Sequence, residues 1–116
     1  ENIQIFSEYK PLSDEEMDTI LDIADRRTAK TVLPCTACRY CTTHCPQGLD
    51  IPSLIALYNE HCFTHGGFIA PMALMALPDD KKPSACIGCH SCEAVCPQQI
   101  KITAAMTDFA EKLAQN

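Results

Sequence analysis

Eight of the nine cysteines in this chain fall into two copies of one pattern, CxxCxxCxxxCP. Three cysteines at three-residue steps can bind three irons of one 4Fe-4S cubane, and the fourth iron then takes a thiolate from the other copy. We therefore expect two 4Fe-4S clusters with crossed ligation. The sets are Cys35, Cys38, Cys41 and Cys96 for one cluster, and Cys86, Cys89, Cys92 and Cys45 for the other.

Other uses of so many cysteines fit this spacing less well. A disulfide framework needs an oxidising compartment, and the chain shows no charged segment followed by the apolar run of a signal peptide. Zinc sites use CxxC pairs separated by a longer loop, rather than three cysteines in series and a fourth followed by proline. A zinc site and a degraded single-cluster site remain the alternatives.

The ninth cysteine and two histidines are weaker candidates. Cys62 lies outside both motifs, and we expect an ordinary buried thiol. His61 and His65 stand four residues apart and could share a metal ion, but Gly66 works against the continuous helix that this requires. A solvated helix end is the preferred interpretation for both.

The loops between the cysteines contain features that could support a cluster. Ala37 in one copy and Gly88 in the other are small, which lets the backbone approach an inorganic core and donate hydrogen bonds to sulfur. His44 and His90 lie in the same loops, where we expect them to pack beside the clusters. Pro46 and Pro97 punctuate the turn that presents the fourth cysteine of each copy.

Length and charge limit what the chain can be. At 116 residues it can bury only a small core. We therefore expect the clusters to cross-link and stabilise the fold, so that folding is coupled to cofactor insertion. The formal charge is −6, and two oxidised cubanes with their thiolates would bring it to about −10. Such a surface disfavours nucleic acid and anionic lipid and favours a redox partner with a basic docking patch. No apolar run is long enough to span a membrane.

No hydrolytic or nucleophilic motif, phosphate loop or dinucleotide fingerprint is present. We therefore expect the chain by itself to be a non-catalytic electron carrier. Export signals are absent and such clusters are oxygen-sensitive, so the expected location is the cytoplasm.

The cysteine pattern is part of a longer internal repeat. A shift of 51 residues lays Cys35–Ile51 over Cys86–Ile102 and matches all four cysteines, the prolines and the following glutamines. Helical patterns flank both copies, which predicts a unit of helix, cysteine loop and helix that occurs twice. We place the repeat halves at about 13–62 and 68–115 within a domain of residues 13–116. Because the chain begins with Glu1 and residues 1–12 lack periodicity, we expect this segment to be a connector from a missing upstream domain.

Four helices should position the cysteine loops. Ser13 and Glu16 form a capping box for the first, and Pro52 stands early in the second. The third is a short apolar helix over 70–77, and Thr103 can cap a last helix over 104–115. The period-two apolar segments of a compact bacterial ferredoxin are missing. The expected fold class is therefore all-α, an α-helical ferredoxin with a pseudo-two-fold repeat around two clusters.

Several segments together resemble a known family: LSDEEM, PCTACRYCTTHCP, GLDIPSLIALYNE and ACIGCHSCEAVCPQQI. The chain is similar, over residues 7–114, to the carboxy-terminal ferredoxin domain of aldo/keto reductase-like oxidoreductases. The resemblance implies a (β/α)8 barrel earlier in the same polypeptide, which would bind a nicotinamide cofactor and carry out the carbonyl chemistry. It implies that the eight motif cysteines hold the clusters of an electron relay.

Two further functional hypotheses stay open at this point. The chain could be an independent helical ferredoxin, or the iron–sulfur subunit of a complex like fumarate reductase or heterodisulfide reductase. It could also be a structural cluster domain that docks a partner without changing its redox state.

Overall fold

A computed structural model of the chain describes residues 2–7, 10–28 and 33–115. The chain divides into two compact units, Glu1–Lys30 and Thr31–Asn116. The expected domain of residues 13–116 thus includes a helix of the first unit and the whole of the second, and its bounds stay a prediction.

The amino-terminal unit holds α1 (Asn2–Ser7) and α2 (Asp14–Thr28). The predicted capping box is confirmed at the start of α2: the Ser13 backbone N–H donates to Glu16 Oε2 at 2.9 Å, and the Glu16 N–H donates to Ser13 Oγ at 3.3 Å. Helix α1 lies within the segment that we expected to be a connector.

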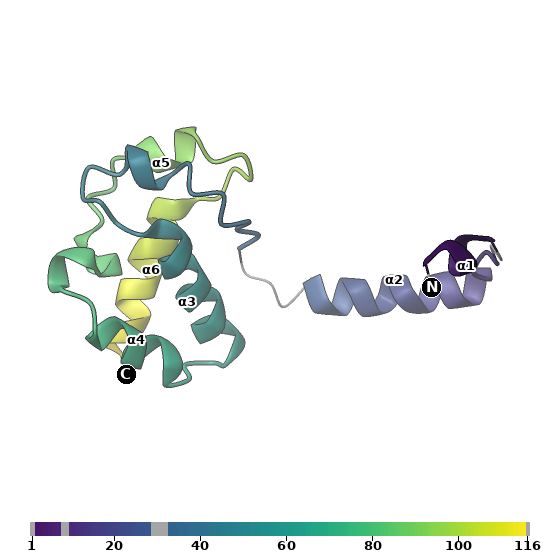
Figure 1. The fold of residues 1–116 in the computed structure, drawn as a ribbon. Helices are drawn as coiled ribbons and strands as arrows, with labels where there is room; N and C mark the ends of the chain where they lie inside the picture. Colours follow the sequence, from purple (N-terminus) through teal and green to yellow (C-terminus); the bar gives the residue numbers. More distant parts are fainter. Residues whose placement is uncertain (1, 8–9, 29–32, 116) are drawn as a thin grey trace. The chain divides into compact units, whose positions relative to one another are not determined.

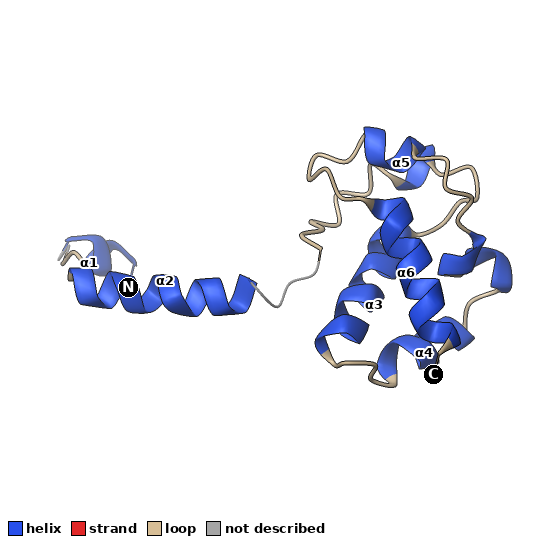
Figure 2. Ribbon diagram, turned by 180° about the vertical axis from the view of Figure 1, so that it is seen from behind, coloured by secondary structure: helices blue, strands red, loops and turns tan. Residues whose placement is uncertain are grey.

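The carboxy-terminal unit is built on two 13-residue helices, α3 (Ile51–Phe63) and α6 (Ile102–Ala114). Helix α4 (Ile69–Met75) packs against α3, and the short helix α5 (Ser91–Ala94) packs against α6. Figures 1 and 2 show α5 and the cysteine loops at the end where α3 and α6 begin, with α4 and the carboxy terminus at the opposite end. The described part of the unit also contains three 3-10 helices: η1 (Thr42–His44), η2 (Asp79–Lys81) and η3 (Pro83–Ala85).

No strand occurs among the described residues, and the all-α class is confirmed. The repeat is visible in the fold because α3 and α6 start at Ile51 and Ile102, which the 51-residue shift aligns. Both isoleucines are fully buried, and the core between the two helices continues along them. Its other fully buried large side chains are those of Leu49, Leu54, Ile55, Met106 and Phe109.

Two helix ends differ from the expectation. Helix α6 begins at Ile102, so Thr103 lies inside the first turn and is not its cap; Thr103 instead donates both its N–H and its hydroxyl to Glu93 of α5. Helix α4 ends at Met75, because the next two N–H groups, of Ala76 and Leu77, bond three residues back to Ala73 and Leu74 in a tightened turn before Pro78.

Candidate iron–sulfur centre

The eight motif cysteines gather around two pockets in the carboxy-terminal unit. One, called here the first pocket, is lined by Cys35, Cys38, Cys41 and Cys96. The second pocket is lined by Cys45, Cys86, Cys89 and Cys92. Each pocket therefore takes three cysteines from one motif and the fourth from the other, which is the grouping that crossed ligation requires.

The two pockets are close copies of each other. Their volumes, including the part open to solvent, are about 320 and 330 Å³. Ten lining residues of the first pocket correspond to ten of the second through the 51-residue shift. The non-cysteine pairs are Thr36 with Ile87, Pro52 with Thr103, Ile55 with Met106, Gln98 with Gln47, Ile100 with Leu49, and Ile102 with Ile51. Because the linings match in size and position, the pockets fit two groups of the same kind.

The backbone of the loops adopts left-handed conformations at matching places. Ala37 and Gly88 have φ of 54° and 68°, and Arg39 and His90 have φ of 66° and 60°. A non-glycine residue pays about 1–2 kcal/mol for this region. Alternation of right- and left-handed residues points successive N–H groups into one concavity, an arrangement that binds anions and iron–sulfur clusters.

The third cysteine of each motif is the most buried ligand candidate. Cys41 and Cys92 are 7% and 5% exposed. Burial raises the pKa of the Cys41 thiol and raises that of Cys92 to about 11. Both are therefore protonated thiols at neutral pH without iron, and metal insertion must release their protons.

Cys89 differs from the buried pair because it is exposed. Hydrogen bonds from the backbone N–H and the side chain of Ser91 lower the pKa of its thiol. None of the nine cysteines, all of them described, forms a disulfide.

The donor set and its surroundings fit a four-iron cluster. No three His, Cys, Asp or Glu side chains in the described residues converge on one point as the ligands of a single ion would. In a cubane each thiolate binds its own iron, so its four ligands stay further apart. Apolar side chains form the walls, and Ile102 lines both pockets. The buried side chain of Ile102 thus borders both candidate cluster positions.

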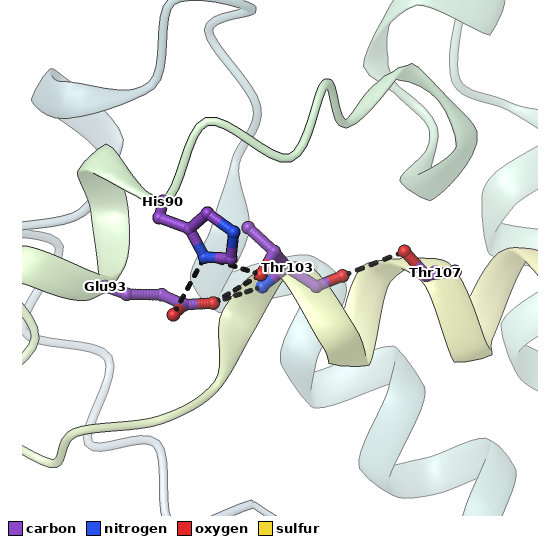
Figure 3. A network of polar contacts seen from close by, with 4 residues as sticks. All are labelled: His90, Glu93, Thr103 and Thr107. Atoms are coloured by element: carbon purple, nitrogen blue, oxygen red, sulfur yellow. Dashed lines mark hydrogen bonds and ion pairs between the residues drawn. The ribbon is translucent and has the colours of Figure 1, made fainter.

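A polar network joins α5 to α6 beside the second pocket (Figure 3). Glu93 Oε1 accepts from the Thr103 N–H at 2.8 Å and from the Thr103 hydroxyl at 2.6 Å, while Oε2 lies 3.2 Å from His90 Nδ1. Burial opposes ionisation of this carboxyl, but the hydrogen bonds from Thr103 and His90 outweigh it and hold the pKa of Glu93 below its ordinary value. Glu93 therefore carries a fixed carboxylate next to Cys92.

Glu93 was not among the residues singled out from the sequence. The sequence could have pointed to Glu93, because the 51-residue shift aligns it with Thr42. One copy of the repeat therefore carries a charge beside its third cysteine where the other copy has none. Arg39, which lines the first pocket and pairs with Asp50 at 3.2 Å, was missed as well; its counterpart is His90. His44 stays within its own loop, with Nδ1 3.0 Å from the Tyr40 carbonyl oxygen.

The remaining candidates lie away from both pockets. His61, Cys62 and His65 line a separate pocket with Lys112 near the end of α6. His61 is 3% exposed and its ring stacks at a tilt against Phe109, with centroids 5.8 Å apart. His65 follows the end of α3 in a left-handed conformation, so it does not continue the helix that a shared metal would need.

Within the described residues, no helix combines the length and apolar character needed to cross a membrane.

Comparisons with known proteins agree with the geometry. Residues 34–101 match the family model for the 4Fe-4S dicluster domain. The chain is also 33% identical over 113 residues to acetyl-CoA decarbonylase/synthase complex subunit alpha 1 of Methanosarcina acetivorans, and 30% identical over 113 residues to that of Methanosarcina barkeri. Each match covers 97% of this chain but 12% of the relative, so the chain spans about an eighth of the length of these relatives. No solved structure matches the chain significantly. The relatives give no support to the resemblance to aldo/keto reductases.

Proposed function

The chain belongs to the 4Fe-4S dicluster domain family, and from that premise we propose that it relays electrons for the active site of a larger oxidoreductase. Two 4Fe-4S clusters are its cofactors, and electron transfer is the function that the domain type carries. The crossed ligand sets, Cys35, Cys38, Cys41 and Cys96 for one cluster and Cys86, Cys89, Cys92 and Cys45 for the other, are part of this proposal.

The observation that carries the proposal is the pair of matching four-cysteine pockets with one side chain, Ile102, in the lining of both. The clusters supply one-electron redox chemistry when bound. The chain holds the two sites in a fixed relation, because α3 and α6 begin beside them and pack together along a buried core. The exposure of Cys38 and Cys89 leaves one edge of each pocket open toward a partner.

Two kinds of larger host are proposed. The curated relatives are subunits of an acetyl-CoA decarbonylase/synthase complex, which favours a large subunit that contains this domain as one part. The sequence resemblance favours a (β/α)8 barrel of an aldo/keto reductase instead, and the relatives do not support that partner. The amino-acid sequence of the complete polypeptide distinguishes them, since a barrel appears as alternating strand and helix patterns. An independent helical ferredoxin would show neither.

The acidic balance supports a basic redox partner rather than nucleic acid. The formal charge of the chain is −6 before any cluster is added, so a docking surface rich in lysine or arginine would be attracted to it at low ionic strength. A cytoplasmic location belongs to the same proposal.

An anaerobic reductive titration of the cluster-loaded protein, followed by electron paramagnetic resonance, tests the relay. The expected result is two one-electron reductions at accessible potentials. If the protein takes up no electron at any accessible potential, the relay proposal fails and a structural cluster domain that docks a partner takes its place.

A further inference from the structure

The two pockets are alike in shape but differ in charge. The shift of 51 residues pairs Glu93 with Thr42, so a carboxylate stands beside the third cysteine of one motif and a neutral hydroxyl beside that of the other. It also pairs His90 with Arg39, a residue that lines the first pocket. Both differences make the surroundings of the first pocket more positive than those of the second.

The carboxylate of Glu93 is held firmly and poorly screened by solvent. Its side chain is 15% exposed, and one oxygen accepts two hydrogen bonds from Thr103, a residue that itself lines the second pocket. The carboxylate is close to the site, because Glu93 directly follows Cys92 in the chain and is bonded to Thr103 in the pocket lining. His90 approaches the other carboxylate oxygen but is largely exposed.

Lysines near the second pocket act in the opposite sense. Lys81 donates to the carbonyl of Gln47, which lines the second pocket, at 2.7 Å. Its side chain is 40% exposed and lies 3.6 Å from the carboxylate of Asp80, so solvent and a counter-charge screen it. Asp50 similarly accompanies Arg39 near the first pocket, and its counterpart by the 51-residue shift, Lys101, is exposed to solvent. Of these charges, the carboxylate of Glu93, at 15% exposure, is the least screened by solvent.

Adding an electron to a cluster adds negative charge, which a nearby carboxylate disfavours and a nearby cation favours. We propose that Glu93 gives the two clusters different reduction potentials, with the cluster of the second pocket the lower and that of the first pocket the higher. Within the relay proposed above, on which this inference rests, an electron that enters at the second pocket then moves downhill to the first. The difference in potential thus sets the direction of electron flow through a domain whose two halves are otherwise alike.

The test is a redox titration of the intact, cluster-loaded protein followed by electron paramagnetic resonance, on the unmodified chain and three variants. Glu93→Gln keeps the acceptor for Thr103 but removes the charge, and should raise the lower midpoint potential only. Arg39→Gln should move the higher midpoint potential less than Glu93→Gln moves the lower one, because Arg39 is exposed and paired with Asp50. Glu111→Gln is the matched control, because it removes a carboxylate from the exposed far half of α6, and should move neither.

A fourth variant keeps the test valid if Glu93→Gln loses its cluster. Thr42→Glu places a carboxylate at the corresponding position of the first loop, and should lower the higher midpoint potential toward the other.

Distinct outcomes separate the inference from the function on which it rests. Two reductions at one common potential, or a Glu93→Gln shift confined to the higher step, overturn the assigned order while the relay stands. If Glu93→Gln loses its cluster, an unchanged higher midpoint in Thr42→Glu overturns it instead. No reduction at all overturns the relay itself.

Discussion

The fourth cysteine of each motif is presented by a turn that the two copies share. The Cys45 carbonyl accepts from the Gly48 N–H at 3.0 Å, and the Cys96 carbonyl accepts from the Gln99 N–H at 3.0 Å. Gly48 and Gln99 both have positive φ, of 60° and 53°. The glycine adopts this conformation without strain. The glutamine is strained in it, so the turn of the second copy is less favourable in free energy.

Replacement of the fourth cysteine tests crossed ligation at the level of single residues. Cys96→Ser should damage the cluster held mainly by the first motif, because its fourth iron loses a thiolate, and Cys45→Ser should damage the other. Iron and sulfide content, with the resonance signal of the surviving cluster, measures the loss. Cys62→Ser is the control and should keep both clusters, since Cys62 lines neither pocket. Iron loss from Cys96→Ser confined to the second-motif cluster would refute the assignment.

At the level of elements, the α3–α6 pair is the support on which both pockets depend. Tyr58 of α3 meets Phe109 of α6 edge-on, with ring centroids 5.5 Å apart at 71°. The Tyr58 hydroxyl donates to Asp108 Oδ2 at 2.7 Å, and Asp108 also pairs with Lys112. Burial, followed by the bond to Asp108, raises the pKa of Tyr58 far above its usual range, so it stays protonated as a donor at any working pH.

Truncation of the central aromatic should weaken this support most. Phe109 is fully buried, so Phe109→Ala should cost about 3–5 kcal/mol through lost burial and the remaining cavity. Thermal unfolding of the anaerobic, cluster-loaded protein measures the effect. Tyr58→Phe is the matched variant: it keeps the ring and removes one hydrogen bond, for about 1 kcal/mol. A Phe109→Ala loss no larger than that of Tyr58→Phe would contradict the assigned role of the α3–α6 core.

At the scale of the whole molecule, the clusters should hold together a fold that has little other support. Between α3 and the start of η3, the helices are short, and the loops that carry the cysteines contain little regular structure. Crossed ligands would join segments as distant in sequence as Cys35 and Cys96. Metal binding in such small domains is coupled to folding.

Removal of the iron should therefore unfold most of the carboxy-terminal unit. We expect anaerobic treatment with a strong iron chelator to abolish most of its helical circular dichroism, and reconstitution with iron and sulfide to restore it. An apoprotein that keeps the native spectrum would show that the α3–α6 core suffices without the clusters.

Short-range sequence patterns were enough to predict several elements of the fold. The capping box at Ser13, the start of the second long helix near Pro52 and the all-α class follow from short-range patterns, and the structure bears them out. The Thr103 cap failed for a physical reason. Glu93, ten residues earlier in the chain, supplies the acceptor for the Thr103 N–H, and a contact between two separate helices leaves no trace in a local pattern.

The sequence by itself determined the cofactor type, the repeat and the eight candidate ligands, because cysteine spacing and the 51-residue shift are properties of the chain alone. Only the tertiary structure decided that the cysteines gather three plus one around two matching pockets, and that Ile102 borders both. It also decided that Glu93 is a shielded carboxylate beside one pocket only. Burial and charge screening depend on which distant segments pack together, and one-dimensional spacing does not contain that information.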